Sequence, residues 1–213
     1  MSGSRQLSRF PWYLRYDVGE RVASRTRQWV IKATHLHCRV EFRGPVRIGR
    51  GFELEMLDHG TLIVGPDVEF RRGFVCEIAG QGRVEIGART VFTAQALVQC
   101  TTSIEIGERC SFGQSLLMFD GVHRYDDLDR HWGDQGWDFE PITIGDGVGV
   151  SDKCTIQSSI GERSMIGSHS VVNRPIPAFS VAAGVPARVV RYFGPDPQLP
   201  AVAGEQQARP QRS

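Results

Sequence analysis

Long apolar runs, an opening signal segment and a strong net charge are all missing from this sequence of 213 residues. Because no run of about 18 apolar residues occurs, no membrane-spanning helix is predicted. No apolar segment typical of a secretory signal opens the chain. The 25 Lys and Arg residues nearly balance the 24 Asp and Glu residues, which argues against a nucleic-acid partner. The sequence therefore predicts a cytoplasmic protein.

Paired cysteine motifs are missing as well. The five cysteines are odd in number and include no Cys-x-x-Cys pair, a usage that indicates reduced, mostly buried thiols. No ligand spacing supports a zinc site, so no metal is expected. Lysine is scarce, with only Lys32 and Lys153, so any phosphate contact is expected from arginine.

What the sequence does contain is a six-residue repeat of apolar residues. An Ile-Gly or Val-Gly dipeptide begins at positions 48, 64, 86, 106, 144, 160 and 166. Apolar residues then return six positions apart, as in the series Ile86, Phe92 and Val98. This period fits neither an α-helix nor a simple strand, and it is typical of a parallel β-helix.

The repeat also predicts how the coil is built. About three hexapeptides form one turn of a triangular prism, and each turn buries its apolar side chains only against its neighbours. The glycine after each aliphatic residue is expected at a corner, where a side chain would crowd the chain or force an unfavourable φ. A β-sandwich would instead show strands 8–12 residues apart with two-residue alternation, which does not dominate here.

Residues 46–193 resemble the hexapeptide-repeat acyltransferases. The resemblance is closest to the O-acetyltransferases that modify maltose, galactosides, nodulation factors and surface polysaccharides. It rests on residues 141–146, on residues 160–172 and, most specifically, on the closing Ala-Gly-Val-Pro-Ala-Arg run at 183–188. The resemblance implies an all-β, left-handed parallel β-helix. It also implies acetyl-CoA or another acyl-CoA as co-substrate, no metal, and a homotrimer with active sites between subunits.

The sequence departs from the family at two points. Gly149-Val150-Ser151 stands where the family usually has Trp-Ile-Gly, and the coil from Ile144 to Ile160 is about two residues short of three hexapeptides. Both changes fall near the family's pantetheine and acceptor sites, so the site is expected to be wider there. The γ-class carbonic anhydrase, which shares the fold, uses a His-x-x-x-x-His ligand pair that does not occur here.

The six-residue rhythm breaks at length only in residues 119–140, a polar and aromatic segment. A loop of this length is usually functional, and we expect it to be extruded from one corner. His123 lies near its start and matches the family's catalytic histidine. Histidine suits the removal of a hydroxyl proton during acyl transfer. Asp120 is the carboxylate that we expect to orient the imidazole, although a surface or turn-capping role is the plainer alternative.

The resemblance also assigns residues to the two substrates. For the acyl-CoA, the backbone N–H of Asp152 matches an oxyanion donor, Ser168 matches a contact of the pantetheine arm, and four polar residues match its anionic end. These four are Asn173, Arg174, Arg188 and Arg191. Exposed arginines at the end of a solenoid are the alternative. For the acceptor, the candidates are Thr93, Gln95, His131, Trp132 and Trp137. We expect His169 to be a structural corner residue.

The sequence predicts three segments. Residues 1–40 form a helical cap, with Leu14, Val18, Val22 and Trp29 on one side of a helix over 9–32. Residues 41–193 form the β-helix, and residues 194–213 are expected to be disordered. A cap over the open end of the β-helix explains the helix, and peripheral contact with a membrane is the alternative.

The predicted function is acyl-CoA-dependent O-acyltransfer, an acetyl group in the first instance, to a sugar hydroxyl. Two alternatives stay open. The first is N-acyltransfer to an amino sugar or an antibiotic, and the second is a β-helix scaffold that has lost catalysis. The sequence does not identify the acceptor.

Overall fold

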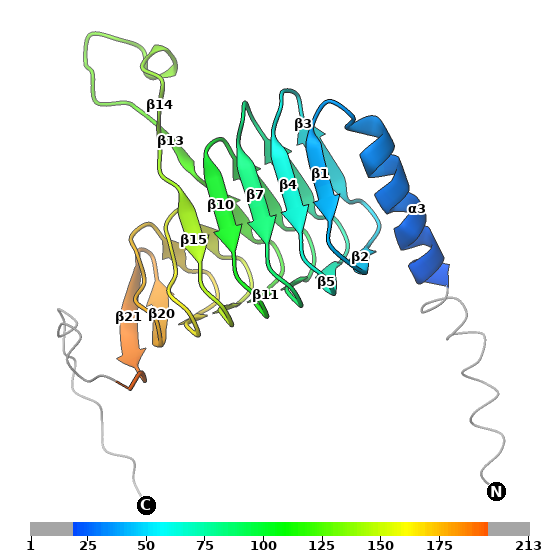
Figure 1. The fold of residues 1–213 in the computed structure, drawn as a ribbon. Helices are drawn as coiled ribbons and strands as arrows, with labels where there is room; N and C mark the ends of the chain where they lie inside the picture. The colour runs from blue at the N-terminus through cyan, green and yellow to red at the C-terminus, as the bar shows by residue number, and fades with distance from the viewer. Residues whose placement is uncertain (1–18, 196–213) are drawn as a thin grey trace, which may run out of the picture.

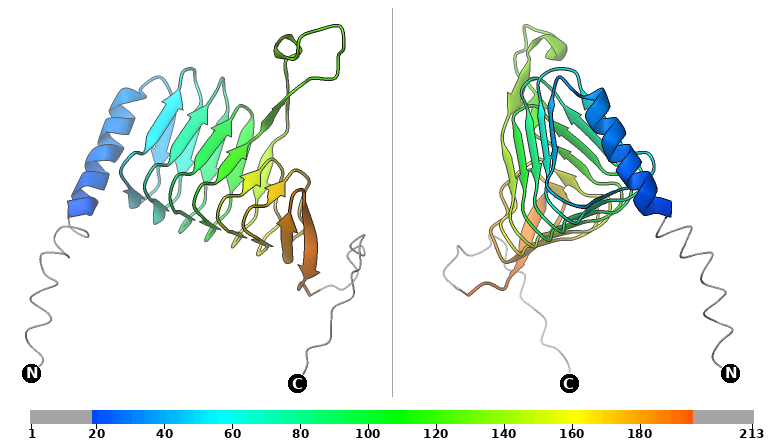
Figure 2. Two further views of the ribbon diagram at one scale, coloured as in Figure 1. Left: turned by 180° about the vertical axis from the view of Figure 1, so that it is seen from behind. Right: turned by 45° about the vertical axis from the view of Figure 1, so that its right-hand side comes forward.

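The computed structural model describes residues 19–195. They form a triangular prism of stacked coils, with the helix α3 (Gly19–Thr34) across its first end (Figures 1 and 2). The helix ends at Thr34, two residues beyond the predicted end at Lys32, and the first strand begins at Arg39. The predicted helical residues 9–18 and nearly all of the predicted tail lie outside the described residues.

Three parallel sheets make the faces of the prism. The first face contains β1 (Arg39–Phe42), β4 (Thr61–Val64), β7 (Arg83–Ile86), β10 (Ser103–Ile106) and β15 (Ile142–Ile144). The second face contains β2 (Val46–Ile48), β5 (Val68–Phe70), β8 (Val91–Phe92), β11 (Ser111–Phe112), β16 (Gly149–Val150), β18 (Met165–Ile166) and β20 (Ser180–Gly184). The third face contains β3 (Glu53–Met56), β6 (Val75–Ile78), β9 (Leu97–Cys100), β12 (Leu117–Phe119), β17 (Thr155–Ile156) and β19 (Val171–Val172).

The coil is left-handed. As the chain advances away from α3, it runs down the near face in Figure 1, crosses below and returns up the far face, which Figure 2 shows from behind. The sequence repeat and its resemblance therefore predicted the fold correctly. The predicted short coil is also present, because Ile144 pairs with Ile160 across a step of 16 residues.

The sequence predicted glycine at the corners for two reasons, close packing and an unfavourable φ, and the structure places these at different residues. A Cβ at Gly87 would lie 2.5 Å from the carbonyl carbon of Gly107, so this glycine is needed for the close approach of two coils. The left-handed φ values fall instead at other corner positions, most of which are not glycine, such as Arg89 at 59° and Gln95 at 57°. Each of these non-glycine residues donates its N–H to a carbonyl of the preceding coil, as Arg89 does to Pro66 at 2.9 Å. His169, with φ of 59°, is a corner residue as predicted.

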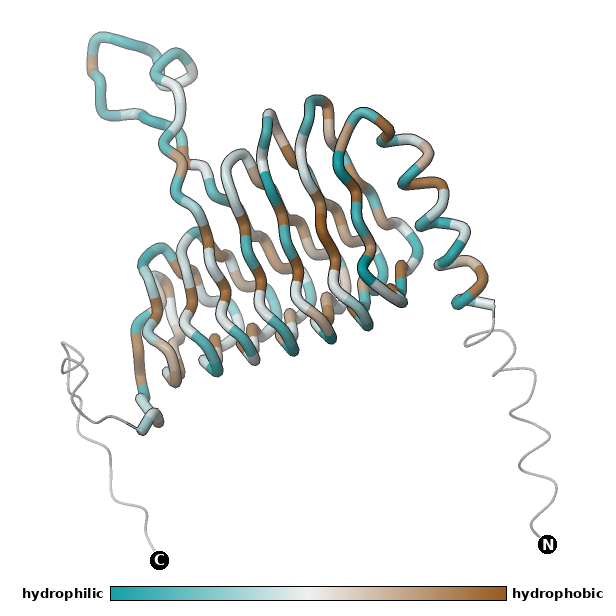
Figure 3. The backbone as a smooth tube through the Cα atoms, in the orientation of Figure 1, coloured by the Kyte–Doolittle hydropathy of each residue, from teal (hydrophilic) through white to brown (hydrophobic). Residues whose placement is uncertain are grey.

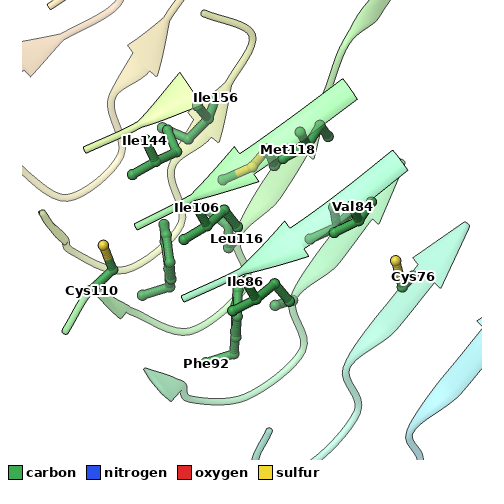
Figure 4. Close-up of a cluster of buried hydrophobic side chains, with 14 of the residues drawn as sticks. Cys76, Val84, Ile86, Phe92, Ile106, Cys110, Leu116, Met118, Ile144 and Ile156 are labelled. Atoms are coloured by element: carbon green, nitrogen blue, oxygen red, sulfur yellow. The ribbon is translucent and has the colours of Figure 1, made fainter. Parts of the chain in front are cut away.

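The inward side chains form one continuous core, part of which is drawn in Figure 4. Along the backbone in Figure 3, hydrophobic positions lie side by side on the strands of successive coils. Along the second face, Phe70, Phe92 and Phe112 stack with ring centroids 5.5 and 4.7 Å apart. Burial raises the pKa of the Cys76 thiol and, together with the charge of Asp120, raises the pKa of Cys100 to about 12. All five cysteines are free, and four of them are buried.

The helix α3 packs on the prism through polar contacts, which the sequence did not predict. Ser24 Oγ donates to the carbonyl of Val46 at 2.9 Å and accepts from the N–H of Ile48 at 2.8 Å. Gln28 Nε2 also donates to Val46 O at 2.7 Å. The first coil leaves strand backbone groups without a neighbouring strand, and a polar helix face satisfies them. The apolar side with Val22 and Trp29 therefore faces solvent.

The loop of residues 120–141 leaves the prism as an antiparallel ribbon. It contains β13 (Gly121–His123) and β14 (Trp137–Phe139), with the short 3₁₀ helix η2 (Trp132–Asp134) between them. The last parallel strand, β20, is covered by the antiparallel strand β21 (Ala187–Tyr192). No helix of the described residues is both long and apolar enough to cross a membrane.

Replacing Phe92 by alanine tests the stacked core. We expect Phe92→Ala to lower the free energy of unfolding by about 3–5 kcal/mol, because the cavity would lie inside a rigid stack of rings. Chemical denaturation measures this change. The matched variant Phe193→Ala removes a ring that is 42% exposed and should cost less than about 1 kcal/mol. Equal losses in the two variants would contradict the stacked core.

Candidate active site

His123 lies at the root of the extruded ribbon, where β13 and β14 pair it with Trp137. The two ring centroids are 3.4 Å apart, and Trp132 meets the imidazole edge-on at 4.9 Å. The Nδ1 atom of His123 is buried and has no hydrogen-bond partner within residues 19–195. The protein acceptor expected on this histidine is therefore not supplied by the described part of the chain.

Asp120 does not orient His123 directly, contrary to the prediction. Its buried carboxylate faces the corner of the preceding coil, where it accepts hydrogen bonds from the N–H groups of Thr101 and Thr102 at 2.9 and 2.7 Å. The Thr102 hydroxyl donates to it at 2.7 Å as well. The backbone carbonyl of Asp120 accepts from the N–H of Glu140 at 2.9 Å. Asp120 thus fixes the base of the ribbon that carries His123.

A cavity of about 870 Å³ runs beside His123 along the corner between the third and first faces. We call it the histidine groove. Its ribbon side is aromatic, with Tyr125, Trp137 and Phe139, and its floor includes Leu117 and Phe119 of β12. Aromatic and aliphatic walls beside a few polar groups are typical of small-molecule sites. Trp137, which the sequence analysis predicted to contact the acceptor substrate, therefore lines the histidine groove.

A polar row crosses the floor of the histidine groove. Glu55, Glu77 and Gln99 point outward from β3, β6 and β9, in register with one another and with Phe119. Gln99 Nε2 donates to the Glu77 carboxylate at 2.6 Å. These residues recur every 22 residues, which is the length of one early coil. The sequence analysis missed them because it followed the six-residue period alone.

A second, smaller cavity of about 420 Å³ lies at the corner between the second and third faces. We call it the arginine cavity. It is lined by Arg71, Arg72, Thr93, Ala94, Gln114 and Asp152. The Thr93 hydroxyl is buried and has no hydrogen-bond partner within residues 19–195. Arg71, Arg72 and Gln114 were not predicted, and only their corner positions in the repeat signal them.

Asp152 presents both its carboxylate and its backbone N–H at the arginine cavity. Its carboxylate accepts a hydrogen bond from the N–H of Gln114 at 2.7 Å, so the side chain links two coils. Its own N–H donates to no acceptor in the described structure and remains available to a ligand. The space at Gly149 is not left open as expected, because a Cβ there would lie 2.5 Å from the Met165 sulfur.

The other predicted residues do not come together in one chain. Gln95 and Ser168 lie at the same corner as the arginine cavity, whereas Asn173 and Arg174 follow β19 at the corner of the histidine groove. Arg188 and Arg191 are exposed on β21. His131 is exposed and accepts from the N–H of Gly133 at 3.2 Å, capping η2.

The third face separates the histidine groove from the arginine cavity. The strands of this face run from the corner of the arginine cavity to the corner of the histidine groove, and a strand of three or four residues spans roughly 10–13 Å. Asp152 therefore lies before the start of these strands, and His123 lies beyond their ends. One chain therefore presents two separate cavities. In residues 19–195, no group of three His, Cys, Asp or Glu side chains is placed to hold a metal ion.

Comparison with known proteins agrees with this architecture. A probable acetyltransferase of Mycobacterium tuberculosis is 28% identical over 190 residues, which are 85% of this chain and 58% of that protein. The galactoside O-acetyltransferase of Escherichia coli is 47% identical over 53 residues, 24% of this chain and 26% of that protein. A hexapeptide-repeat acetyltransferase of Vibrio cholerae, solved in complex with acetyl-CoA, aligns at a TM-score of 0.55 with 20% identity, over 80% of this chain and 78% of that one.

The sequence relatives are acetyltransferases, and the solved structure shares the hexapeptide-repeat fold, so the chain is similar to the hexapeptide-repeat acetyltransferases. No family model matches it. The chain spans little more than half the length of its relative from M. tuberculosis. The resemblance found in the sequence is thus confirmed.

The carboxylate of Asp120 can be tested by removing its charge. Asp120→Asn places an amide NH₂ opposite the N–H donors of Thr101 and Thr102. We expect the free energy of unfolding to fall by about 1–3 kcal/mol, because partly buried donors lose a charged acceptor. Hydrogen exchange at these two amides should accelerate. Asp126→Asn, an exposed change in the same loop, should leave both measurements unchanged, and protected amides in Asp120→Asn would contradict the anchoring role.

Proposed function

We propose that the protein transfers an acyl group, acetyl in the first instance, from acyl-CoA to a hydroxyl of a sugar, with His123 as the general base. The observation that carries this proposal is the imidazole at the edge of a large aromatic groove, with one ring nitrogen left without a partner in the described chain. Similarity to acetyltransferases supports the acyl-CoA donor.

His123 performs the proton transfers of a direct reaction. Its imidazole takes the proton of the acceptor hydroxyl as that oxygen forms a bond to the thioester carbonyl carbon. The carbon–sulfur bond then breaks, and the imidazolium returns the proton to the sulfur, which leaves as the free thiol of CoA. No acyl-enzyme is required. Trp137 and Trp132 pack on the imidazole and limit its rotation.

The arginine cavity suits the donor. The N–H of Asp152 is available to stabilise negative charge on the thioester oxygen. Arg71 and Arg72 supply guanidinium groups for the anionic end of CoA, and Ser168 lies at the same corner one coil beyond Asp152. Four further contacts with acyl-CoA are still predictions from the sequence: Asn173, Arg174, Arg188 and Arg191.

A homotrimer would join the two cavities. In one chain the proposed base and the proposed donor site lie at opposite ends of the strands of the third face. In a closed ring of copies, the histidine groove of one copy can face the arginine cavity of the next. The missing acceptor for His123 Nδ1 is then also expected from the adjacent copy. We therefore propose that the active site is shared between subunits.

A specific observation favours a second candidate, N-acyltransfer to an amino sugar or another amine. Glu55 and Glu77 place two carboxylates on the floor of the histidine groove, and within the described residues neither forms an ion pair with Arg or Lys. A protonated amine would offset their charge. A scaffold without catalysis remains the alternative to both reactions, and it is tested by whether the protein binds acetyl-CoA.

Removal of His123 tests the mechanism. We expect His123→Ala to reduce CoA thiol release by at least about 100-fold, because general-base catalysis contributes about 10²–10⁴. The assay supplies acetyl-CoA with parallel panels of sugars and amino sugars, so its products separate O- from N-transfer. His59→Ala, at an exposed corner of the first coils, should keep the parent rate. Unchanged thiol release in His123→Ala would exclude the histidine as base.

Mixed oligomers test whether the site is shared. His123→Ala and the double variant Arg71→Glu/Arg72→Glu should each be inactive alone. When they are unfolded together and reassembled, about a quarter of the sites should combine an intact His123 with an intact arginine pair from another copy, by random assortment. Recovered thiol release measures this fraction. If no activity returns although mixed oligomers are present by mass spectrometry, the site lies within one chain.

A further inference from the structure

The outer face of α3 is apolar and has no partner in the described structure. Helical spacing brings Val22, Thr26, Trp29 and Ala33 onto one side, and Leu36 continues it just past the helix end. Val22 is 62% exposed, Trp29 71% and Leu36 86%. These residues lie opposite Ser24 and Ile31, which are buried against the prism.

Basic residues lie along one flank of this face. By the same helical spacing, Arg21, Arg25 and Lys32 share that flank, and all three are exposed. The single acidic residue of the helix, Glu20, is instead turned toward the prism side. It is 3.3 Å from Arg27 and 3.5 Å from Arg50.

The sequence around this helix carries a net positive charge, unlike the rest of the chain. Residues 1–36 contain seven Arg and Lys residues against two Asp and Glu residues, whereas the whole chain has 25 against 24. The remainder of the protein is therefore acidic overall. A local positive charge beside exposed tryptophan and aliphatic side chains is the composition of a helix that lies in a membrane interface.

We propose that the outer face of α3 binds the surface of an anionic lipid membrane. Val22, Trp29 and Leu36 enter the interface, while Arg25 and the flanking basic residues contact anionic headgroups. The polar attachment of α3 to the first coil makes this possible, because it leaves the apolar face for a partner outside the prism. Membrane binding does not depend on acyl transfer, so each proposal can fail without the other.

Vesicle sedimentation of the full-length protein tests membrane binding. Phosphatidylcholine vesicles with one-third phosphatidylserine should carry the protein into the pellet, and pure phosphatidylcholine vesicles should not. Binding should weaken with added salt, since the charge attraction is screened. Arg25→Glu should weaken partitioning roughly ten-fold or more, because each basic residue near an anionic surface contributes about a five-fold factor and the change reverses one charge. Trp29→Ser should also reduce binding.

Matched controls keep the test specific. Arg109→Glu makes the same charge change at an exposed corner of a distant coil and should bind nearly as the parent does. His123→Ala should sediment like the parent, whether or not it is active. Circular dichroism checks that each variant is folded.

Three results would overturn the proposal. The first is no binding to anionic vesicles, or binding that Trp29→Ser and Arg25→Glu leave unchanged. The second is self-association in solution that Trp29→Ser abolishes, which would make a second copy the partner of this face. The third is binding that occurs only after residues 1–18 are removed, which would make that segment the occupant.

Discussion

The stacking of each coil on the next, backbone to backbone, is the constraint on which the rest of the structure depends. Gly87 shows how tight this contact is, since even a Cβ there would lie 2.5 Å from the chain of the following coil. The corner residues with left-handed φ hold the same register through hydrogen bonds to the preceding coil. An inserted segment can therefore leave the prism only at a corner, and the chain after it must resume the same alignment with the preceding coil. The ribbon of β13 and β14 satisfies this condition, and Asp120 anchors its start.

The same constraint determines what one chain can offer as an active site. Side chains of one corner form a row along the prism, so His123 shares its corner with the floor residues of the histidine groove and not with Asp152. The proposed base and the proposed donor cavity are kept apart by the width of the third face. Each cavity also contains one buried polar atom without a partner in the described chain, His123 Nδ1 in the first and Thr93 Oγ1 in the second. Both observations favour assembly of the site from two copies.

The sequence predicted most of the fold, because the six-residue period reports directly on the inward side chains. It also located the loop and His123, where that period breaks. Three features were beyond it. Asp120 binds Thr101 and Thr102 across one coil, a contact that depends on coil length. Glu55 and Glu77 repeat with the whole coil rather than with the hexapeptide. The sequence did not predict which side of α3 faces the prism, because the apolar side of a helix usually packs inward. The open end of a β-helix instead presents backbone groups that need polar partners.

A crystal structure of the protein with CoA is the most direct test of the shared active site. We expect a trimer in which the CoA thiol lies between His123 of one copy and Asp152 of the next, with the anionic end of CoA near arginines. CoA bound within a single chain, with its thiol distant from every His123, would contradict this arrangement.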